Sequence, residues 1–167
     1  QLQVSASSDS PTLLSAAAFV LAGSGANRTV QITPAANQNG VATVVISVSD
    51  GTTTATKTFI LTVNAVNDSP TISDIPDQVI VADASTAVLP FSVSDVETGA
   101  GSLVISLNSD NQVLVPISGI VLGGSGGSRT IQVTPAAAQA GVANITVTVS
   151  DGGLSAADQF KVTVNAV

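Results

Sequence analysis

The fold is decided by the stretch VTVSDGGLSAADQFKVTVNAV, which runs from Val147 to Val167. Before its Asp-Gly-Gly turn, Val147 and Val149 alternate with threonine and serine, and after the turn Phe160 and Val162 alternate with polar residues in the same way. An apolar residue at every second position is the period of a strand with one buried face. The stretch therefore predicts two antiparallel strands joined by a turn.

Shorter runs rich in β-branched residues predict the other strands. They are Thr71 to Val81, Ala87 to Ser94, Leu103 to Asn108, Gln112 to Val121 and Arg129 to Val133. Together these make about seven strands at spacings of roughly 8 to 15 residues, which is the pattern of an antiparallel β-sandwich. No window keeps a helical period for long, and Pro135 to Ala140 is too short for a helix and predicts a loop or one 3₁₀ turn. The chain is predicted to be all-β.

The chain also repeats itself. Leu2 to Val66 aligns without a gap on Leu103 to Val167, a shift of 101 positions, and about half of the aligned residues are identical. A fixed period indicates one structural unit used in series. We predict a partial repeat at residues 1–66 and a complete repeat at residues 67–167. A division after Ser102 fits the same period.

The partial repeat would lack the strands that Thr71 to Ser94 predicts for the complete one. A sheet without its neighbouring strand exposes unpaired backbone N–H and C=O groups. We therefore expect residues 1–66 to be completed by another chain through strand addition, or to be part of a continuous fibre.

Composition excludes several classes of partner. The net charge is −7 and there are only four lysines and arginines, so no basic surface exists to bind nucleic acid or anionic lipid. No apolar run approaches the roughly 18 residues of a membrane-spanning helix, so direct membrane insertion is not expected. There is no cysteine, and hence no disulfide.

The chain contains few residues of the types that enzymes use for catalysis. The absence of histidine excludes a Ser/His/Asp triad and a histidine-bound zinc. Asp95 and Glu97 form the natural carboxylate pair for sugar hydrolysis, yet sugar sites usually contain Trp or Tyr, and both are absent. The glycines of Gly123 to Gly127 lack the lysine and helix of a phosphate loop and predict a turn. Arg28 and Arg129 occupy equivalent positions and predict a structural cation at a strand start. We predict no enzyme, no catalytic residue and no organic cofactor.

The run Val147 to Val167 and the junction VNAVNDSPTIS, Val63 to Ser73, resemble the last strands and the linker of cadherin-like repeats. The whole period resembles the immunoglobulin-like or cadherin-like tandem repeats of very large bacterial surface proteins of the adhesin type. Those repeats commonly begin with Asn-Asp-x-Pro and contain a segment similar to LPFSVSDVET, Leu89 to Thr98. The resemblance implies tandem immunoglobulin-like β-sandwiches outside the cell, on a bacterial surface. Without a cysteine pair or a core tryptophan, the repeat is not of the antibody type.

The resemblance also implies a calcium site. The carboxylates at positions that supply calcium ligands in cadherin-like repeats are Asp68, Asp95, Glu97 and Asp151. Calcium binds six to eight oxygens, and the strand order would bring these loops together at the linker end of the second repeat. The middle loop TPAAAQAG, Thr134 to Gly141, departs from the cadherin pattern because it has no carboxylate. The alternative is that the four acids are ordinary turn residues that bind backbone amides.

Two functions follow. The first is a structural, rod-like spacer or filament element, in which neighbouring repeats are the partners. The alternative is an adhesive module that binds a glycan or protein receptor through its loops or an exposed strand edge. The linker has no Gly-rich hinge, and Pro70 restricts Ser69 to extended conformations, so adjacent repeats are expected to swing little. The lack of Tyr, Trp and His, on which binding energy usually depends, favours the spacer.

Overall fold

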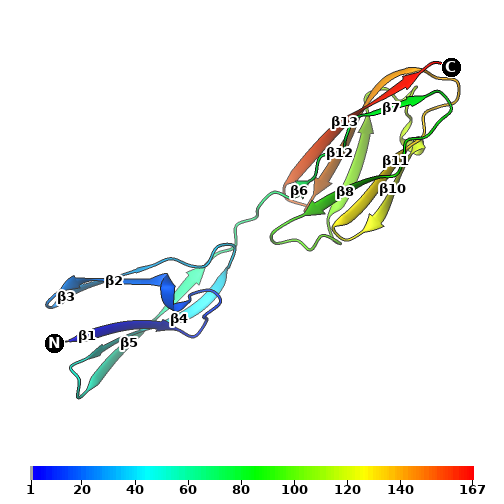
Figure 1. Cartoon of the computed structure of the whole chain (residues 1–167). Coiled ribbons are helices and arrows are strands. Elements are labelled where there is room, and N and C mark those ends of the chain that lie inside the picture. The colour runs from blue at the N-terminus through cyan, green and yellow to red at the C-terminus, as the bar shows by residue number, and fades with distance from the viewer. Residues whose placement is uncertain (1) are drawn as a thin grey trace. The chain divides into compact units, whose positions relative to one another are not determined.

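The computed structural model describes residues 2–167, which divide into two compact units between Val66 and Asn67. We call residues 2–66 unit 1 and Asn67–Val167 unit 2. Both consist of strands, and the helical elements of the described chain are two 3₁₀ turns, η1 (Ala16–Ala18) and η2 (Ile117–Gly119) (Figure 1). None of the helical segments in residues 2–167 is long and apolar enough to cross a membrane. The all-β prediction is confirmed.

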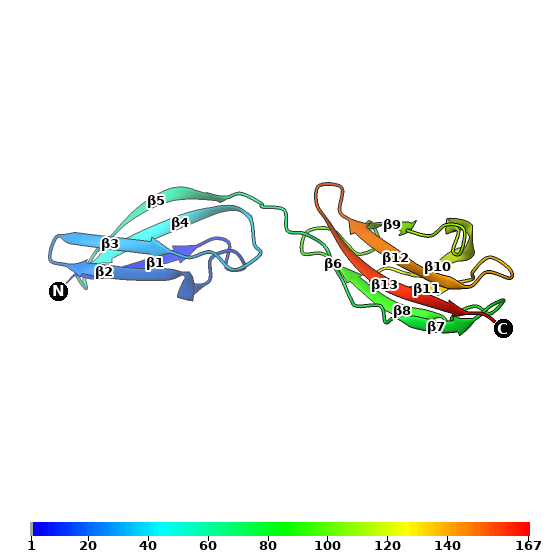
Figure 2. The same cartoon turned by 90° about the horizontal axis from the view of Figure 1, so that it is seen from above.

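Unit 2 is a sandwich of two four-stranded sheets (Figures 1 and 2). Across the first sheet the order is β10 (Ile120–Ser125), β11 (Ser128–Val133), β8 (Leu89–Ser94) and β6 (Thr71–Ile72). Across the second it is β7 (Gln78–Val81), β13 (Ser155–Asn165), β12 (Gly141–Ser150) and β9 (Val104–Ser109). Neighbouring strands are antiparallel except β7 and β13, which run parallel.

The core of unit 2 lies between these sheets. Alternate residues of β12 and β13 face it, and Ile145, Val147 and Val149 are fully buried there together with Phe160 and Val162. Valine and isoleucine suit this environment because their branched side chains pack well on a pleated surface. The strands predicted around the Asp-Gly-Gly turn are therefore confirmed, and they pair along their whole length.

The predicted strand Gln112 to Val121 is wrong. Most of it is a turn followed by η2, and β10 begins only at Ile120. The cause is local, because Asn111 accepts hydrogen bonds from Leu114 N through its side chain and from Val115 N through its carbonyl. Leu114 and Val115 are buried although they are not in a strand, so their hydrophobicity reflects core packing.

The predicted strand Thr71 to Val81 is broken into two. Residues Ser73–Asp77 interrupt it, so that β6 joins one sheet and β7 joins the other, and unit 2 has eight strands where about seven were expected. Within the break, Ile75 is buried and its backbone N donates to Asp158 Oδ2 at 3.0 Å. A side chain of β13 thus holds the crossing point between the sheets.

The glycine-rich stretch of unit 2 forms the β10–β11 hairpin and is shorter as a turn than predicted. Strand pairing continues to Ser125 and Ser128, leaving Gly126 and Gly127 as the turn. Gly124 has φ of +79°, and a Cβ there would collide with the carbonyl oxygen of Ser128. Glycine is required at this position because it alone adopts the conformation without strain.

Unit 1 contains fewer strands. Its sheet has the order β1 (Gln3–Ser8), β4 (Gly40–Ser49) and β5 (Thr54–Val63), and a hairpin is formed by β2 (Phe19–Ser24) and β3 (Asn27–Ile32). These five strands are the repeat counterparts of β9, β12, β13, β10 and β11. Residues 2–66 contain no counterpart of β6, β7 or β8. The buried core of unit 1 is correspondingly small and contains Leu13, Leu14, Ala18, Ala42 and Val44.

Candidate functional site

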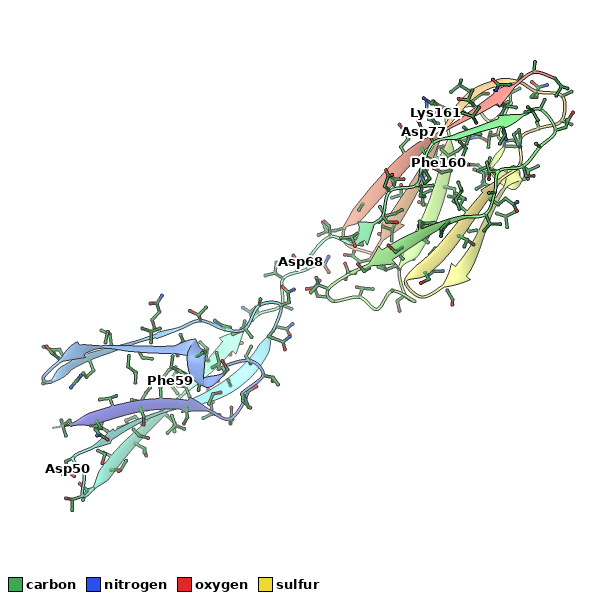
Figure 3. All side chains as sticks on the ribbon, viewed as in Figure 1. Asp50, Phe59, Asp68, Asp77, Phe160 and Lys161 are labelled. Carbon is green, nitrogen blue, oxygen red and sulfur yellow. The ribbon has the colours of Figure 1, made fainter. Side chains whose placement is uncertain are left out.

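The start of unit 2 is tied to two of its loops. The backbone N of Asp68 donates to Glu97 Oε2 at 3.1 Å, in the loop that follows β8. The side chain of the preceding residue, Asn67, donates through Nδ2 to Asp151 Oδ2 at 2.8 Å, in the β12–β13 turn. The strand order therefore brings these loops together at the linker end of unit 2, where Figure 3 marks Asp68.

Asp95 shapes the loop after β8. Its Oδ1 accepts hydrogen bonds from Glu97 N at 3.0 Å and Thr98 N at 2.6 Å, which is the usual role of aspartate at the start of a turn. Its Oδ2 is buried and has no hydrogen-bond partner within residues 2–167. A buried carboxylate oxygen without a donor is energetically unfavourable. The hydrogen bonds at the linker end of unit 2 therefore do not explain the burial of Asp95 Oδ2.

Asp151 is held mainly by its own turn. Its Oδ1 accepts from Gly153 N at 2.6 Å and from Leu154 N at 2.7 Å. These backbone donors, Leu154 first, together with the Asn67 side chain hold the pKa of Asp151 below its usual value. The counterpart Asp50 accepts from the backbone of its own turn in the same way, and its pKa is also lowered. Only the Asn67 contact is particular to unit 2.

The structure brings the loops of the four predicted calcium ligands to one end of unit 2, where two hydrogen bonds connect the start of the unit to these loops. Asp68 meets Glu97, and Asp151 meets Asn67. Within the described part of the chain, no three acidic, His or Cys side chains lie close enough together to hold a metal ion. Calcium binding stays a prediction. Asn67 was not among the predicted site residues, although it belongs to the Asn-Asp-x-Pro element.

The lowered pKa of Asp151 predicts a pH effect. A carboxyl group whose pKa is lower in the folded state stabilises the fold above its unfolded pKa of about 3.9, and this contribution is lost as the pH falls through the folded value. We expect Asp151→Ala to destabilise unit 2 at pH 7, and the difference from wild type to shrink as the pH falls below about 4. Chemical unfolding across this pH range measures it. A difference that does not depend on pH would contradict the assignment.

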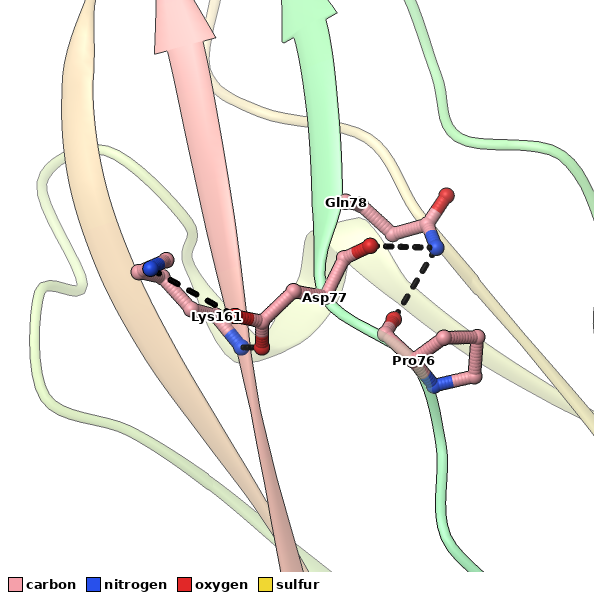
Figure 4. Close-up of polar contacts among 4 residues, drawn as sticks. All are labelled: Pro76, Asp77, Gln78 and Lys161. Atoms are coloured by element: carbon pink, nitrogen blue, oxygen red, sulfur yellow. Dashed lines mark hydrogen bonds and ion pairs between the residues drawn. The ribbon is translucent and has the colours of Figure 1, made fainter.

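A second polar contact fastens β7 to β13. Asp77 Oδ1 accepts from Lys161 N at 2.7 Å, and Asp77 Oδ2 lies 3.4 Å from Lys161 Nζ (Figure 4). The backbone donor is the main cause of the lowered pKa of Asp77. Gln78 donates to the carbonyls of Pro76 and Asp77 and fixes the turn before β7. This contact orients β7. The side chains of Asp77 and Lys161 are exposed to solvent and bind each other.

The two arginines bind backbone carbonyls. Arg129 Nη2 donates to Ala100 O at 3.3 Å, while Arg28 Nη1 donates to Gly23 O at 3.1 Å. Neither arginine forms an ion pair within residues 2–167. The structural role that the sequence predicted for both is confirmed.

Residues 67–165 match the family model of the bacterial Ig domain. The chain belongs to the bacterial Ig domain family. This membership confirms the immunoglobulin-like fold that the resemblance implied, and it indicates an extracellular or surface module of structural or adhesive type. Such domains are typically not catalytic.

Several solved structures are similar to this chain at low sequence identity. The titin M10–obscurin-like 1 Ig complex is 19% identical over 59% of this chain and 95% of that chain, with a TM-score of 0.44. Titin Z1Z2 in complex with telethonin is 14% identical over 99% of this chain and 82% of that chain, with a TM-score of 0.48. An endo-fucoidan hydrolase of glycoside hydrolase family 107 is 21% identical, and the match covers 99% of this chain but 24% of the enzyme, with a TM-score of 0.42. No curated protein sequence matches the chain.

Proposed function

We propose that this chain is a structural, non-catalytic repeat module that acts as a rod-like spacer in a bacterial surface protein. The observation that supports it best is the junction between the repeats. The last strand of unit 1 ends at Val63, and Asn67 is already bonded to Asp151 of unit 2. Three residues, Asn64, Ala65 and Val66, are left between them, and none is a glycine. A connection this short, without glycine, suits a module that acts as a spacer.

The chemistry of the linker end supports the same proposal. Its carboxylates are engaged mainly by backbone amides, as in ordinary turns. Binding sites usually concentrate their energy in aromatic and arginine anchors, yet the chain has no Trp or Tyr, and both arginines bind backbone carbonyls. An adhesive module that recognises a glycan or a protein receptor is the alternative, and the following experiment separates the two.

Small-angle scattering tests the spacer. A chain lengthened by a further copy of Asn67–Val167 should gain maximum dimension by about one domain length, and insertion of Gly-Gly-Ser after Ala65 should broaden its distance distribution. If the extra copy leaves the maximum dimension unchanged, the result would contradict the spacer role. Reproducible binding to a glycan array, or specific retention of a protein receptor, would favour the adhesive module instead.

Calcium at the linker end is a second proposal, favoured by the unpartnered Asp95 Oδ2. A cation there would supply the missing partner, and Asp68, Glu97 and Asp151 stand on the adjoining loops. Because a ligand that binds only the folded state raises the unfolding midpoint, we expect millimolar calcium to raise the melting temperature of unit 2 relative to chelator. The variant Asp95→Asn should abolish the shift, and Asp50→Asn in unit 1 should retain it. An unchanged melting temperature would remove calcium from the account.

A further inference from the structure

Unit 2 has two lateral sides, and each is formed by one edge strand of either sheet. The short strand β6 contacts β13 in the other sheet, so β6 and β7 lie on one side, and β10 and β9 lie on the other. Figure 2 shows β9 on the side opposite to β7. An edge strand exposes unpaired backbone N–H and C=O groups, and proteins usually protect such edges with short strands, prolines or charged side chains. The two sides of unit 2 differ in this protection.

The side formed by β6 and β7 is protected. Strand β6 has only two residues and directly follows Pro70. Strand β7 has four residues, and the charged pair of Asp77 and Lys161 stands at its start, directly after Pro76. A further strand therefore finds little regular backbone to pair with on this side.

The side formed by β9 and β10 lacks these features. Each strand has six residues, and neither contains a charged residue or a proline. In β10, Gly124 has a positive φ of +79° and departs from the regular extended backbone. Strand β9 has no residue of this kind, and within residues 2–167 it pairs only with β12. Strand β9 is therefore the regular, unprotected edge of unit 2.

The free edge of β9 offers two residues to a further strand. Asp110 N, just after β9, donates to Asn144 O of β12. Because backbone groups alternate in direction along an antiparallel strand, the even-numbered residues of β9 face β12, and the odd-numbered Ile105 and Leu107 face the free edge. The side chains of Ile105 and Leu107 pack against the core and are only half-buried. An added strand would bond their backbone groups and cover their side chains.

The core is also incompletely covered at β10. Leu122 lies opposite Ile131 in the β10–β11 pair and so points toward the core with it, yet Leu122 is 37% exposed and Ile131 is 0% exposed. The counterpart of Leu122 in unit 1 is Leu21, which is 37% exposed as well. The counterpart of β9 is β1, which is also an edge strand without charge or proline. The open side is therefore shared by both units and does not depend on Thr71–Ser94.

We propose that β9 binds β9 of a second copy of this chain, antiparallel and across a twofold axis. The two sheets that contain β9 would then become one continuous sheet. Such a contact is isologous, because both copies use the same surface. The inference goes beyond the proposed function, in which repeats are joined in series, because it joins spacer modules side by side.

The sequence of β9 suits pairing with itself. When the twofold axis passes through Ser106, Ile105 of each copy lies opposite Leu107 of the other, on the core-facing side of the sheet. On the solvent-facing side, Val104 lies opposite Asn108, and Ser106 lies opposite itself. Apolar core-facing residues thus pair with each other, and no like charges are opposed. A register shifted by one residue loses this match, because core-facing residues would lie opposite solvent-facing ones.

Charge favours a second copy as the occupant of this edge. The net charge of the chain is −7, so two copies repel each other over most directions of approach. Strands β9 and β10 contain none of the acidic residues. Asp110, which follows β9, is bound by the backbone and side-chain nitrogens of Asn144 through both of its carboxylate oxygens. Two acidic copies can therefore meet at β9 without opposing charges.

Charge variants at Ser106 test the proposal. Sedimentation of the whole chain should show a dimer whose fraction rises with concentration. Ser106→Lys places two lysines opposite each other and should weaken the dimer by roughly tenfold or more, and Ser106→Asp should do the same. An equimolar mixture of the two variants should restore the dimer. The control is Ser92→Lys, at an exposed position on the inner strand β8 of the other sheet, and it should leave the dimer unchanged.

Amide exchange tests whether β9 is the strand that pairs. In the dilute monomer, the amides of Ile105 and Leu107 should exchange faster than those of Ser106 and Asn108, which face β12. At concentrations that favour the dimer, this difference should shrink by roughly tenfold or more.

Three results would overturn the proposal. The first is a chain that stays monomeric at about 1 mM. The second is a dimer that Ser106→Lys does not weaken, or in which the exchange difference persists. The third is equal exchange at the four amides in the dilute monomer, which would mean that the chain itself covers β9. The scattering test of the spacer can be made on the monomeric Ser106→Lys variant, so its outcome is independent of this one.

Discussion

Replacing Phe160 with alanine should lower the free energy of unfolding of unit 2 by about 3–5 kcal/mol, the usual cost of deleting a buried aromatic side chain. Phe160 is the largest of the fully buried side chains, and it stands on β13 in the core between the two sheets. The substitution removes the apolar contact area of the ring and leaves a cavity that close-packed neighbours fill only in part. Hydrogen exchange of the slowest β12 amides under native conditions measures the loss.

The matched control is Phe59→Ala, the same substitution at the equivalent position of unit 1. Because Phe59 is half-exposed, its deletion should cost about 1 kcal/mol or a little more, in proportion to the smaller area removed from water. Equal losses in the two units would mean that Phe59 is covered in solution, and would contradict the difference in packing between the repeats.

Thr86→Val should destabilise unit 2 by about 1–3 kcal/mol, although the two side chains have nearly the same shape. The Thr86 hydroxyl is buried, accepts a hydrogen bond from Val133 N at 3.0 Å and donates to Ala87 O at 2.8 Å. Valine leaves the buried amide of Val133 without a partner, and this desolvation cost outweighs the gain from an extra methyl group. Chemical unfolding of the whole chain, followed through unit 2 signals, gives the difference.

Thr86→Ser separates the hydroxyl from the packing. Serine keeps the bond to Val133 and loses only a methyl group, so it should cost less than valine does. If serine proved as costly as valine, the methyl group and not the hydrogen bond would be the important part of this residue.

Period-two alternation was sufficient to predict the long strands. Where the buried side of a strand is apolar and the other polar, as in β12 and β13, register and orientation follow from the pattern. The apolar pattern is misleading at Gln112 to Val121, because Leu114 and Val115 are buried although they do not lie in a strand. The hydrophobicity of a residue indicates that it is buried, but it does not indicate which backbone conformation the residue adopts.

The break between β6 and β7 could not be predicted for a different reason. The apolar pattern from Thr71 to Val81 is continuous enough for one strand, and Pro76 is compatible with an edge. Within the break, Ile75 N donates to Asp158, a residue far away in the sequence. Such a contact is set by tertiary structure and cannot be identified from the local apolar pattern.

The sequence predicted where the candidate site residues lie better than it predicted which contacts they make. Strand order brought Asp68, Glu97 and Asp151 to one end of unit 2, as expected. The sequence could not show which hydrogen bonds each carboxylate makes, and these decide how many oxygens remain for a cation. Asp50 is informative here because it binds the amides of its own turn in unit 1, as Asp151 does in unit 2. The backbone contacts of Asp151 therefore belong to the turn, and its contact with Asn67 is additional to them.

Thr71–Ser94 closes the edges of β11 and β13 in unit 2, whereas within residues 2–66 the counterpart edges of β3 and β5 have no strand beside them. Amide exchange of the unmodified chain, followed residue by residue by NMR, tests it most directly. The amides of Val133 and Lys161 should exchange at least roughly tenfold more slowly than those of their counterparts Ile32 and Ile60. Equal exchange at the four amides in a monomeric chain would contradict the account.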